Sequence, residues 1–271
     1  MKIGVSTWSL LGQDVTSAVQ AIGDAGFEYV ELWGEVPHAH PDWIDRRKLK
    51  DALSPYGMIV TTHAPFTDLN PATPFEPVKG AIERTLEQFV EFSIFIGARI
   101  VTVHPGSVHN EALVSRSAAS SLSVLRKMVS AAAGRLSVSV ENQARSGSRY
   151  HYPLASTAES LQALLSGEER LRFTLDTGHA HASGLDPQDL AQKAGPKLVE
   201  VHLSDNSGEY DDHLVPGEGT ADLKKLTGML AGSDVLICLE LNPHRYTSGQ
   251  VLKASYSFKS SATSREHRNH A

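Results

Sequence analysis

The sequence predicts an α/β protein folded as a single (β/α)₈ TIM barrel. Short, β-branched apolar runs alternate with segments in which apolar residues recur every three or four positions, as on one face of a helix. Eight such runs occur, and their starts lie roughly thirty to forty residues apart, which is the size of one strand-plus-helix unit. The length of 271 residues is ordinary for one barrel of this kind.

The expected strands end at polar or charged residues. The runs at 100–103 and 235–239 are nearly continuous apolar stretches, as is typical of parallel strands covered on both faces. Eight alternating units favour a closed barrel over the alternative, an open doubly wound sheet. The expected strands are residues 2–7, 29–33, 58–62, 99–103, 136–141, 171–176, 197–203 and 235–241.

Amphipathic segments between these strands predict the helices. Gly26 and Gly97 follow two of the expected helix ends and suit the left-handed turn that closes a helix. We expect the barrel to occupy residues 1–250, and the Ser-rich, basic residues 251–271 to form a last helix remnant and a disordered tail. The expected helices are residues 15–25, 43–53, 81–96, 113–133, 155–165 and 223–230.

The composition is that of an ordinary globular protein, with 41% hydrophobic and 21% charged residues. No apolar run is long enough to cross a membrane, and the chain enters its first expected strand at once, so we expect a cytoplasmic protein without a membrane partner. The net charge of −6 disfavours non-specific nucleic-acid binding. The single cysteine, Cys238, lies in an apolar run, which excludes an internal disulfide and indicates a buried thiol.

Imidazole and carboxylate side chains stand at or just after the ends of six successive expected strands. In a parallel barrel these strand ends converge on one face, which carries the active site. So many such groups in one concave site would be desolvated and would repel one another, whereas bound Zn²⁺ or Mn²⁺ offsets both effects. The candidate metal ligands are His63, His104, Glu141, Asp176, His179, His202, Asp211, His213 and Glu240.

We expect the other polar residues considered, Glu200 and the remaining histidines, to lie outside the metal site. Glu200 alternates with Val199 and Val201, so we expect it to face outward against a helix. The remaining histidines are expected to be solvated in loops or in the tail, with His109 and His181 as candidates for the rim of the site. These histidines are His38, His40, His109, His151, His181, His244, His267 and His270.

Short motifs around the candidate ligands give the chain a resemblance to the xylose-isomerase-like TIM-barrel superfamily (AP endonuclease family 2). That superfamily unites endonuclease IV with sugar isomerases and epimerases, and the resemblance covers nearly the whole barrel. At its metal motifs the chain is most similar to endonuclease IV. The motifs are HAPF around His63, HPGS around His104, VEN around Glu141, DTGHAHASGLD from Asp176, HLSD from His202, DDH ending at His213 and LEL around Glu240.

The resemblance to endonuclease IV implies hydrolysis of a phosphoester by metal-activated water. Endonuclease IV holds three zinc ions with nine ligands, so the resemblance implies up to three Zn²⁺ ions, with Mn²⁺ as the alternative. Glu141 and Glu240 are the catalytic candidates, since both would anchor or bridge the metals and Glu141 would also activate the water. DNA is less favoured as the partner, because residues 8–14 and 34–42 contain no copy of the DNA-penetrating segments of endonuclease IV.

The alternative is a sugar or sugar-phosphate isomerase or epimerase that uses a single divalent metal. In such enzymes, residues equivalent to Glu141, Asp176, His202 and Glu240 bind the metal, and the two glutamates remove and return a proton beside a carbonyl. The substrate arginine that epimerases carry after the seventh strand is absent from residues 206–209. A non-enzymatic metal-binding barrel is a third hypothesis. The sequence leaves the oligomeric state open.

Overall fold

Eight parallel strands close into one barrel in the computed structural model, which describes residues 1–145 and 150–269, with side chains up to residue 262. The strand order is β1-β10-β9-β8-β6-β4-β3-β2, and β1 pairs with both β10 and β2. The prediction of a single (β/α)₈ TIM barrel is therefore confirmed. The barrel strands are β1 (Lys2–Ser6), β2 (Tyr29–Trp33), β3 (Ile59–His63), β4 (Ile100–Val103), β6 (Ser137–Glu141), β8 (Arg172–Asp176), β9 (Leu198–Leu203) and β10 (Leu236–Leu239).

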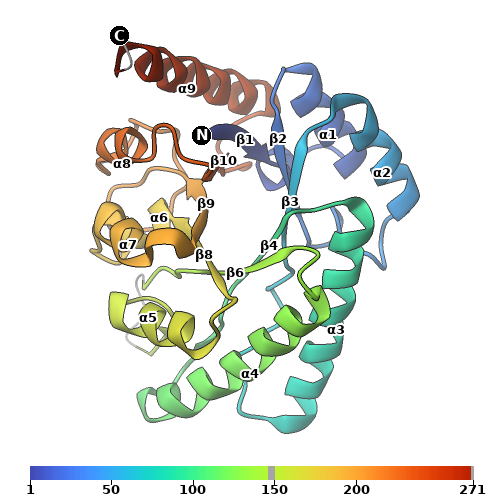
Figure 1. The fold of residues 1–271 in the computed structure, drawn as a ribbon, viewed down its shortest axis with the longest axis vertical. Helices are drawn as coiled ribbons and strands as arrows, with labels where there is room; N and C mark the ends of the chain where they lie inside the picture. The colour runs from blue at the N-terminus through green and yellow to red at the C-terminus, as the bar shows by residue number, and fades with distance from the viewer. Residues whose placement is uncertain (146–149, 270–271) are drawn as a thin grey trace.

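Helices surround the barrel, with α3 and α4 side by side along one flank (Figure 1). The six predicted helices are present, with ends that differ by a few residues, and α6 and α7 occur in addition. Short 3₁₀ turns and an antiparallel ribbon of β5 with β7 complete the fold. The helices are α1 (Val15–Asp24), α2 (Arg46–Leu53), α3 (Glu76–Ile96), α4 (Val114–Ala132), α5 (Ala158–Gly167), α6 (Thr177–Ala182), α7 (Pro187–Ala194), α8 (Leu223–Met229) and α9 (Ser248–Asn269). The ribbon strands are β5 (Ser107–Val108) and β7 (Tyr152–Pro153), and the 3₁₀ turns are η1 (Thr7–Leu10), η2 (Ser54–Tyr56), η3 (Glu111–Leu113) and η4 (Gly195–Lys197).

Aspartate side chains begin several of the helices. Asp14 accepts the backbone N–H groups of Thr16 and Ser17 at the start of α1, which satisfies donors that have no partner within the helix. Asp186 caps α7 in the same way, and Pro187 occupies its first turn, where the missing N–H costs nothing. This Asp-Pro pair is a sequence signal from which α7 could have been predicted.

The last helix, α9, runs to Asn269, whereas a short remnant was expected there. It lies at the end of the molecule that carries the N-terminus (Figure 1), and near its start the side chain of Val251 is fully buried. None of the helices described, α9 included, is both long and apolar enough to cross a membrane.

A polar layer fills the barrel interior below the strand ends, and it corrects one expectation. Glu200 points into the barrel and is fully buried, where its carboxylate accepts hydrogen bonds from the hydroxyls of Thr61 (2.9 Å), Thr102 (2.8 Å) and Tyr29. The outward orientation expected for Glu200 was wrong because a barrel strand is buried on both faces. The apolar neighbours of Glu200 therefore do not reveal which face points inward.

Strand β1 approaches β2 so closely that residue 4 must be glycine. A Cβ atom on Gly4 would overlap the carbonyl oxygen of Tyr29 and lie 2.6 Å from Cδ1 of its ring. We expect Gly4→Ala to lower the free energy of unfolding by about 1–3 kcal/mol, the usual cost of overpacking a core. Chemical denaturation measures this change. Gly12→Ala is the matched control, because a Cβ there meets nothing within 4 Å; equal losses in the two variants would contradict the packing argument.

Candidate metal centre

The nine predicted ligands converge at the carboxyl ends of the barrel strands. Eight of them fall into three groups, two of which share Glu141 and His202, and in each group the potential ligand atoms lie within 4.8 Å of one another. The ninth, His104, places Nε2 2.9 Å from Oε2 of Glu141 and so adjoins the first group. The three groups are His63–Glu141–His202, Glu141–Asp176–His202–Glu240 and His179–Asp211–His213.

Glu141, the last residue of β6, lies at the centre of the site and is 1% exposed. Its Oε2 lies 3.1 Å from Nε2 of His63, and its Oε1 lies 3.0 Å from Nδ1 of His202. Burial acts to raise the pKa of Glu141, but the imidazoles of His202 and His104 outweigh it and hold the pKa well below its usual range. Glu141 is therefore an anion to which imidazoles from three other strands point.

Three of the histidines are oriented in the same way. The Nδ1–H groups of His63, His179 and His213 donate to the backbone carbonyls of Ala64 (2.9 Å), Asn142 (2.7 Å) and Glu240 (3.0 Å), respectively. In each ring Nε2 then faces a carboxylate: Glu141 for His63, and Asp211 for the other two, at 3.1 and 3.0 Å. A metal-binding histidine is held in this manner, with one nitrogen donating outward and the lone pair of the other directed at the ion.

The acidic side chains retain lone pairs without partners. Oδ1 of Asp176 accepts the backbone N–H of His179 at 2.6 Å, which starts α6, but Oδ2 of Asp176 and Oδ1 of Asp211 are buried without a hydrogen-bond partner among the described residues. Burial raises the pKa of Asp176, and burial together with nearby Glu31 and Glu141 raises the pKa of Glu240 to about 8. Unpaired, buried carboxylate oxygens beside oriented imidazoles are a donor set that fits a divalent cation.

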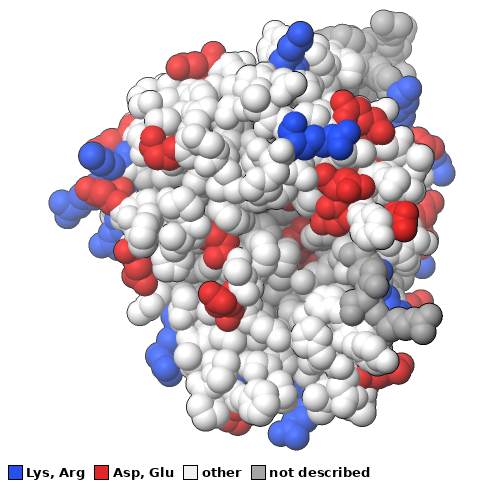
Figure 2. Space-filling view, turned by 180° about the vertical axis from the view of Figure 1, so that it is seen from behind, with Lys and Arg blue, Asp and Glu red and all other residues white. Residues whose placement is uncertain are grey.

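The site opens into a cavity of about 190 Å³. Its aromatic wall includes Trp8, whose ring centroid lies 4.7 Å from that of His213, and Phe66, which stacks on His104 at 4.4 Å. Acidic side chains gather around a hollow in the middle of the face shown in Figure 2, whereas most Lys and Arg side chains lie toward its edges. Such a distribution favours cations in the hollow. The cavity is lined by Trp8, Trp33, His63, Phe66, His104, Glu141, His179, Asp211, His213 and Glu240.

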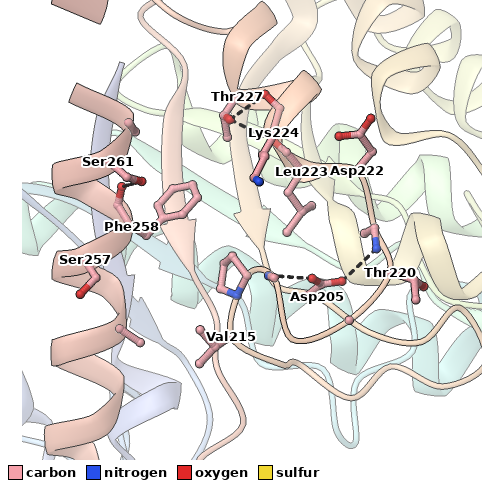
Figure 3. A pocket seen from close by; sticks show the side chains of 16 residues that line it. Asp205, Val215, Thr220, Asp222, Leu223, Lys224, Thr227, Ser257, Phe258 and Ser261 are labelled. Atoms are coloured by element: carbon pink, nitrogen blue, oxygen red, sulfur yellow. Dashed lines mark hydrogen bonds between the residues drawn. The ribbon is translucent and has the colours of Figure 1, made fainter. Parts of the chain in front are cut away.

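A larger cavity of about 540 Å³ lies outside the barrel, between α8 and α9 (Figure 3). Leu223 and Phe258 form apolar walls. The carboxylate of Asp205 accepts the backbone N–H groups of Gly217 (2.8 Å) and Ala221 (3.0 Å). Asp205 thus fixes the loop that forms this cavity. The clustered imidazoles and carboxylates lie elsewhere, at the mouth of the barrel.

Two buried polar residues near the site were not identified from the sequence. Glu31 in β2 is fully buried and its Oε2 lies 2.9 Å from Nε2 of His202. Burial acts to raise the pKa of Glu31, but His202 outweighs it and lowers the pKa. Asn142 binds both the backbone N–H and the carbonyl of Asp176, at 2.8 and 2.9 Å, and so links β6 to β8. A charge within the apolar run Val30-Glu31-Leu32 was the signal for the first residue.

The histidines expected to be solvated follow that expectation only in part. The expectation was wrong for His38, which is fully buried and donates Nε2–H to the carbonyl of Gln13, because its loop packs against the segment that precedes α1. His109 and His181 are absent from the cavity wall, and His181 lies in α6 with Nε2 2.8 Å from the hydroxyl of Thr220. His270 and the side chain of His267 lie outside the described part of the chain.

The family to which the chain belongs follows from its similarity to known proteins. The model for the xylose isomerase-like TIM barrel matches residues 19–259. The chain belongs to the xylose isomerase-like TIM-barrel family. An uncharacterized protein of Methanocaldococcus jannaschii is 28% identical over 253 residues, which cover 89% of this chain and 83% of that protein. An uncharacterized protein of Mycobacterium tuberculosis is 28% identical over 282 residues, which cover 98% of this chain and 93% of that protein.

Solved structures of this family that resemble the chain include epimerases. A D-tagatose 3-epimerase-like protein superposes with a TM-score of 0.84 at 26% identity, and the match covers 100% of both chains. An L-ribulose 3-epimerase gives a TM-score of 0.78 at 17% identity, covering 99% of this chain and 96% of that one. The second likeness is one of fold, whereas the first also extends to the sequence.

The metal-free protein should lose stability as the pH rises from about 6.5 to about 9. Carboxylate neighbours outweigh burial and raise the pKa values of His63 and His213 from 6.5 to about 9. A raised pKa stabilises the fold fully below the unfolded value, and this contribution is lost as the pH passes the folded value. Glu240, with its pKa of about 8, acts in the same direction.

Thermal unfolding in the presence of a chelator, at a series of pH values, measures this loss. We expect the fall in Tm between pH 6.5 and 9 to be shallower in His213→Asn, because one of the raised groups is gone. A Tm that stays level across this range, or an equal slope in the variant, would show that these imidazoles carry no stabilising charge.

Proposed function

We propose that the protein is a metal-dependent enzyme that isomerises or epimerises a sugar by moving a proton next to a carbonyl group. The observation that carries the proposal is the group formed by Glu141, Asp176, His202 and Glu240, in which two glutamates share one compact set of ligands at the mouth of the barrel. The 26% identity to a D-tagatose 3-epimerase-like protein supports a sugar substrate. The phosphoester hydrolysis expected first receives no support from the named structures, and neither does binding of DNA.

A divalent ion such as Mn²⁺ or Zn²⁺ at Glu141, Asp176, His202 and Glu240 would supply Lewis acidity that polarises the sugar carbonyl. Beside it, one glutamate removes the proton from the carbon next to the carbonyl. The other glutamate returns a proton, either to the opposite face of the same carbon or to the neighbouring carbon. Glu141 and Glu240 are the candidates for these two proton transfers, because both carboxylates line the cavity that would hold the sugar. The rings of Trp8, Trp33 and Phe66 form an apolar part of the cavity wall.

Metal binding should stabilise the protein and depend on Glu141. We expect a saturating divalent ion to raise the stability of the chelator-treated protein by about 2.7 kcal/mol at a hundred times its Kd. Glu141→Gln should weaken metal binding at least tenfold and abolish turnover, because the residue lies at the centre of the ligand set. Calorimetric titration and thermal unfolding measure both effects, with the exposed Glu76→Gln as the control. Unchanged metal affinity in Glu141→Gln would contradict the proposed centre.

A second candidate function, phosphoester hydrolysis at three metals, is favoured by one observation. Beside the proposed centre, His63 extends it through the shared Glu141 and His202, and His179, Asp211 and His213 form a separate group with ligand spacing. Epimerisation at a single metal does not need His213 as a ligand, whereas hydrolysis at three metals does.

His213→Asn together with a metal count distinguishes the two functions. Under the proposed function we expect about one tightly bound ion per chain, turnover of a ketose from a panel of ketopentoses and ketohexoses, and retention of most of that activity in His213→Asn. The measurements are elemental analysis and chromatography of the sugar products. Three bound ions, cleavage of a chromogenic phosphodiester, and loss of both one ion and the cleavage in His213→Asn would establish hydrolysis instead.

A further inference from the structure

The imidazole of His202 lies between two pairs of carboxylates. On one side, Nδ1 is 3.0 Å from Oε1 of Glu141 and 3.5 Å from Oε2 of Glu240. On the other side, Nε2 is 2.9 Å from Oε2 of Glu31 and 4.0 Å from Oε2 of Glu200. His202, Glu31 and Glu200 are fully buried, so water does not compete for these contacts. The ring therefore connects the proposed metal centre to the polar layer inside the barrel.

The two nitrogens of the His202 ring cannot both donate a hydrogen bond when the ring is neutral. A neutral imidazole carries one N–H, and an ionised carboxylate only accepts hydrogen bonds. An ion held by Glu141 and Glu240 would take the lone pair of Nδ1, and the single N–H then lies on Nε2, where Glu31 accepts it. We propose that Glu31 is a positioning residue that fixes the Nε2–H tautomer and the ring orientation of His202, and so presents Nδ1 to the metal.

Glu31 differs from the groups that hold the other histidines. His63, His179 and His213 donate to neutral backbone carbonyls, whereas His202 donates to a carboxylate. A carboxylate partner makes a hydrogen bond roughly twice as strong and increases the basicity of the ligating nitrogen. His202 is also the only histidine of the four-residue group, so its orientation affects that group directly.

Glu31, Glu200 and His202 also have the spacing of a metal site, but the surroundings favour positioning. The oxygens of Glu200 already accept hydrogen bonds from Thr61 and Thr102 and from the phenol of Tyr29. The cavity at the barrel mouth, by contrast, is lined by Glu141 and Glu240. An ion that enters from this cavity would therefore meet the Nδ1 side of the ring.

The inference rests on the proposed metal centre, but not on which reaction the centre carries out. Its test is the affinity for Zn²⁺, measured by competition with a chromophoric chelator, in the wild type, Glu31→Gln and Glu200→Gln. We expect Glu31→Gln to bind Zn²⁺ 10- to 100-fold more weakly, the usual effect of losing such a partner. Glu200→Gln is the matched control, because it removes an equally buried carboxylate that makes no hydrogen bond to His202. Its affinity should stay within about threefold of the wild type.

Thermal unfolding of the metal-free variants separates affinity from folding. Long-range ¹H–¹⁵N spectra of the Zn²⁺-loaded wild type provide a second readout that needs no variant of Glu31. We expect the His202 ring to carry its proton on Nε2, with its signal assigned by its absence from His202→Asn. A proton on Nδ1, an unchanged affinity in Glu31→Gln, or an equal loss in Glu200→Gln would overturn the positioning role while leaving the proposed function intact. A wild type that binds no Zn²⁺ would overturn both.

Discussion

Burial of several carboxylates at one end of the barrel is the constraint on which the rest of this structure depends. Glu31, Glu141, Asp176 and Glu200 are at most 1% exposed. An ionised carboxylate that leaves water without a partner loses several kcal/mol, so each of these groups requires a donor or a cation. The donors come from different strands, which ties the register of the barrel to the chemistry of its mouth.

The compensation differs with depth. At the deepest level, Glu200 is held by hydroxyl groups, and burial together with nearby Glu31 raises its pKa. One layer higher, Glu31 is compensated by His202. At the strand ends, Glu141 contacts imidazoles, while Oδ2 of Asp176 has no hydrogen-bond partner in the described part of the chain. The need for an added positive charge therefore increases toward the open end of the barrel, where an ion enters from solvent.

The sequence predicted the barrel and the convergence of the candidate ligands at its mouth, because both depend on local patterns. Eight apolar runs determine the strands, and the residue that closes each run must lie at the carboxyl end of the barrel, whatever the packing. The inward orientation of the Glu200 side chain and the hydrogen bond between Glu31 and His202 depend instead on how strands far apart in the chain meet across the barrel interior. Both faces of a barrel strand are apolar, so the periodicity of one strand does not distinguish them.

The three ligand groups differ in charge, and this difference bears on how many ions bind. The group proposed as the active centre combines three carboxylates with the single imidazole of His202. The group around Asp211 combines one carboxylate with two imidazoles, and these imidazoles hold the pKa of Asp211 well below its usual range although burial opposes them. The third group draws its one carboxylate, Glu141, from the first.

The first group contains the most carboxylates, so it is the group that would attract a divalent cation most strongly. Protonated histidines can neutralise the other two groups without any ion, and the raised pKa values of His63 and His213 make that protonation available at neutral pH. A single ion at the proposed centre of Glu141, Asp176, His202 and Glu240 would therefore compensate the largest group of carboxylates at the barrel mouth. Further ions must compete with protons for their imidazole ligands, so their binding weakens as the pH falls.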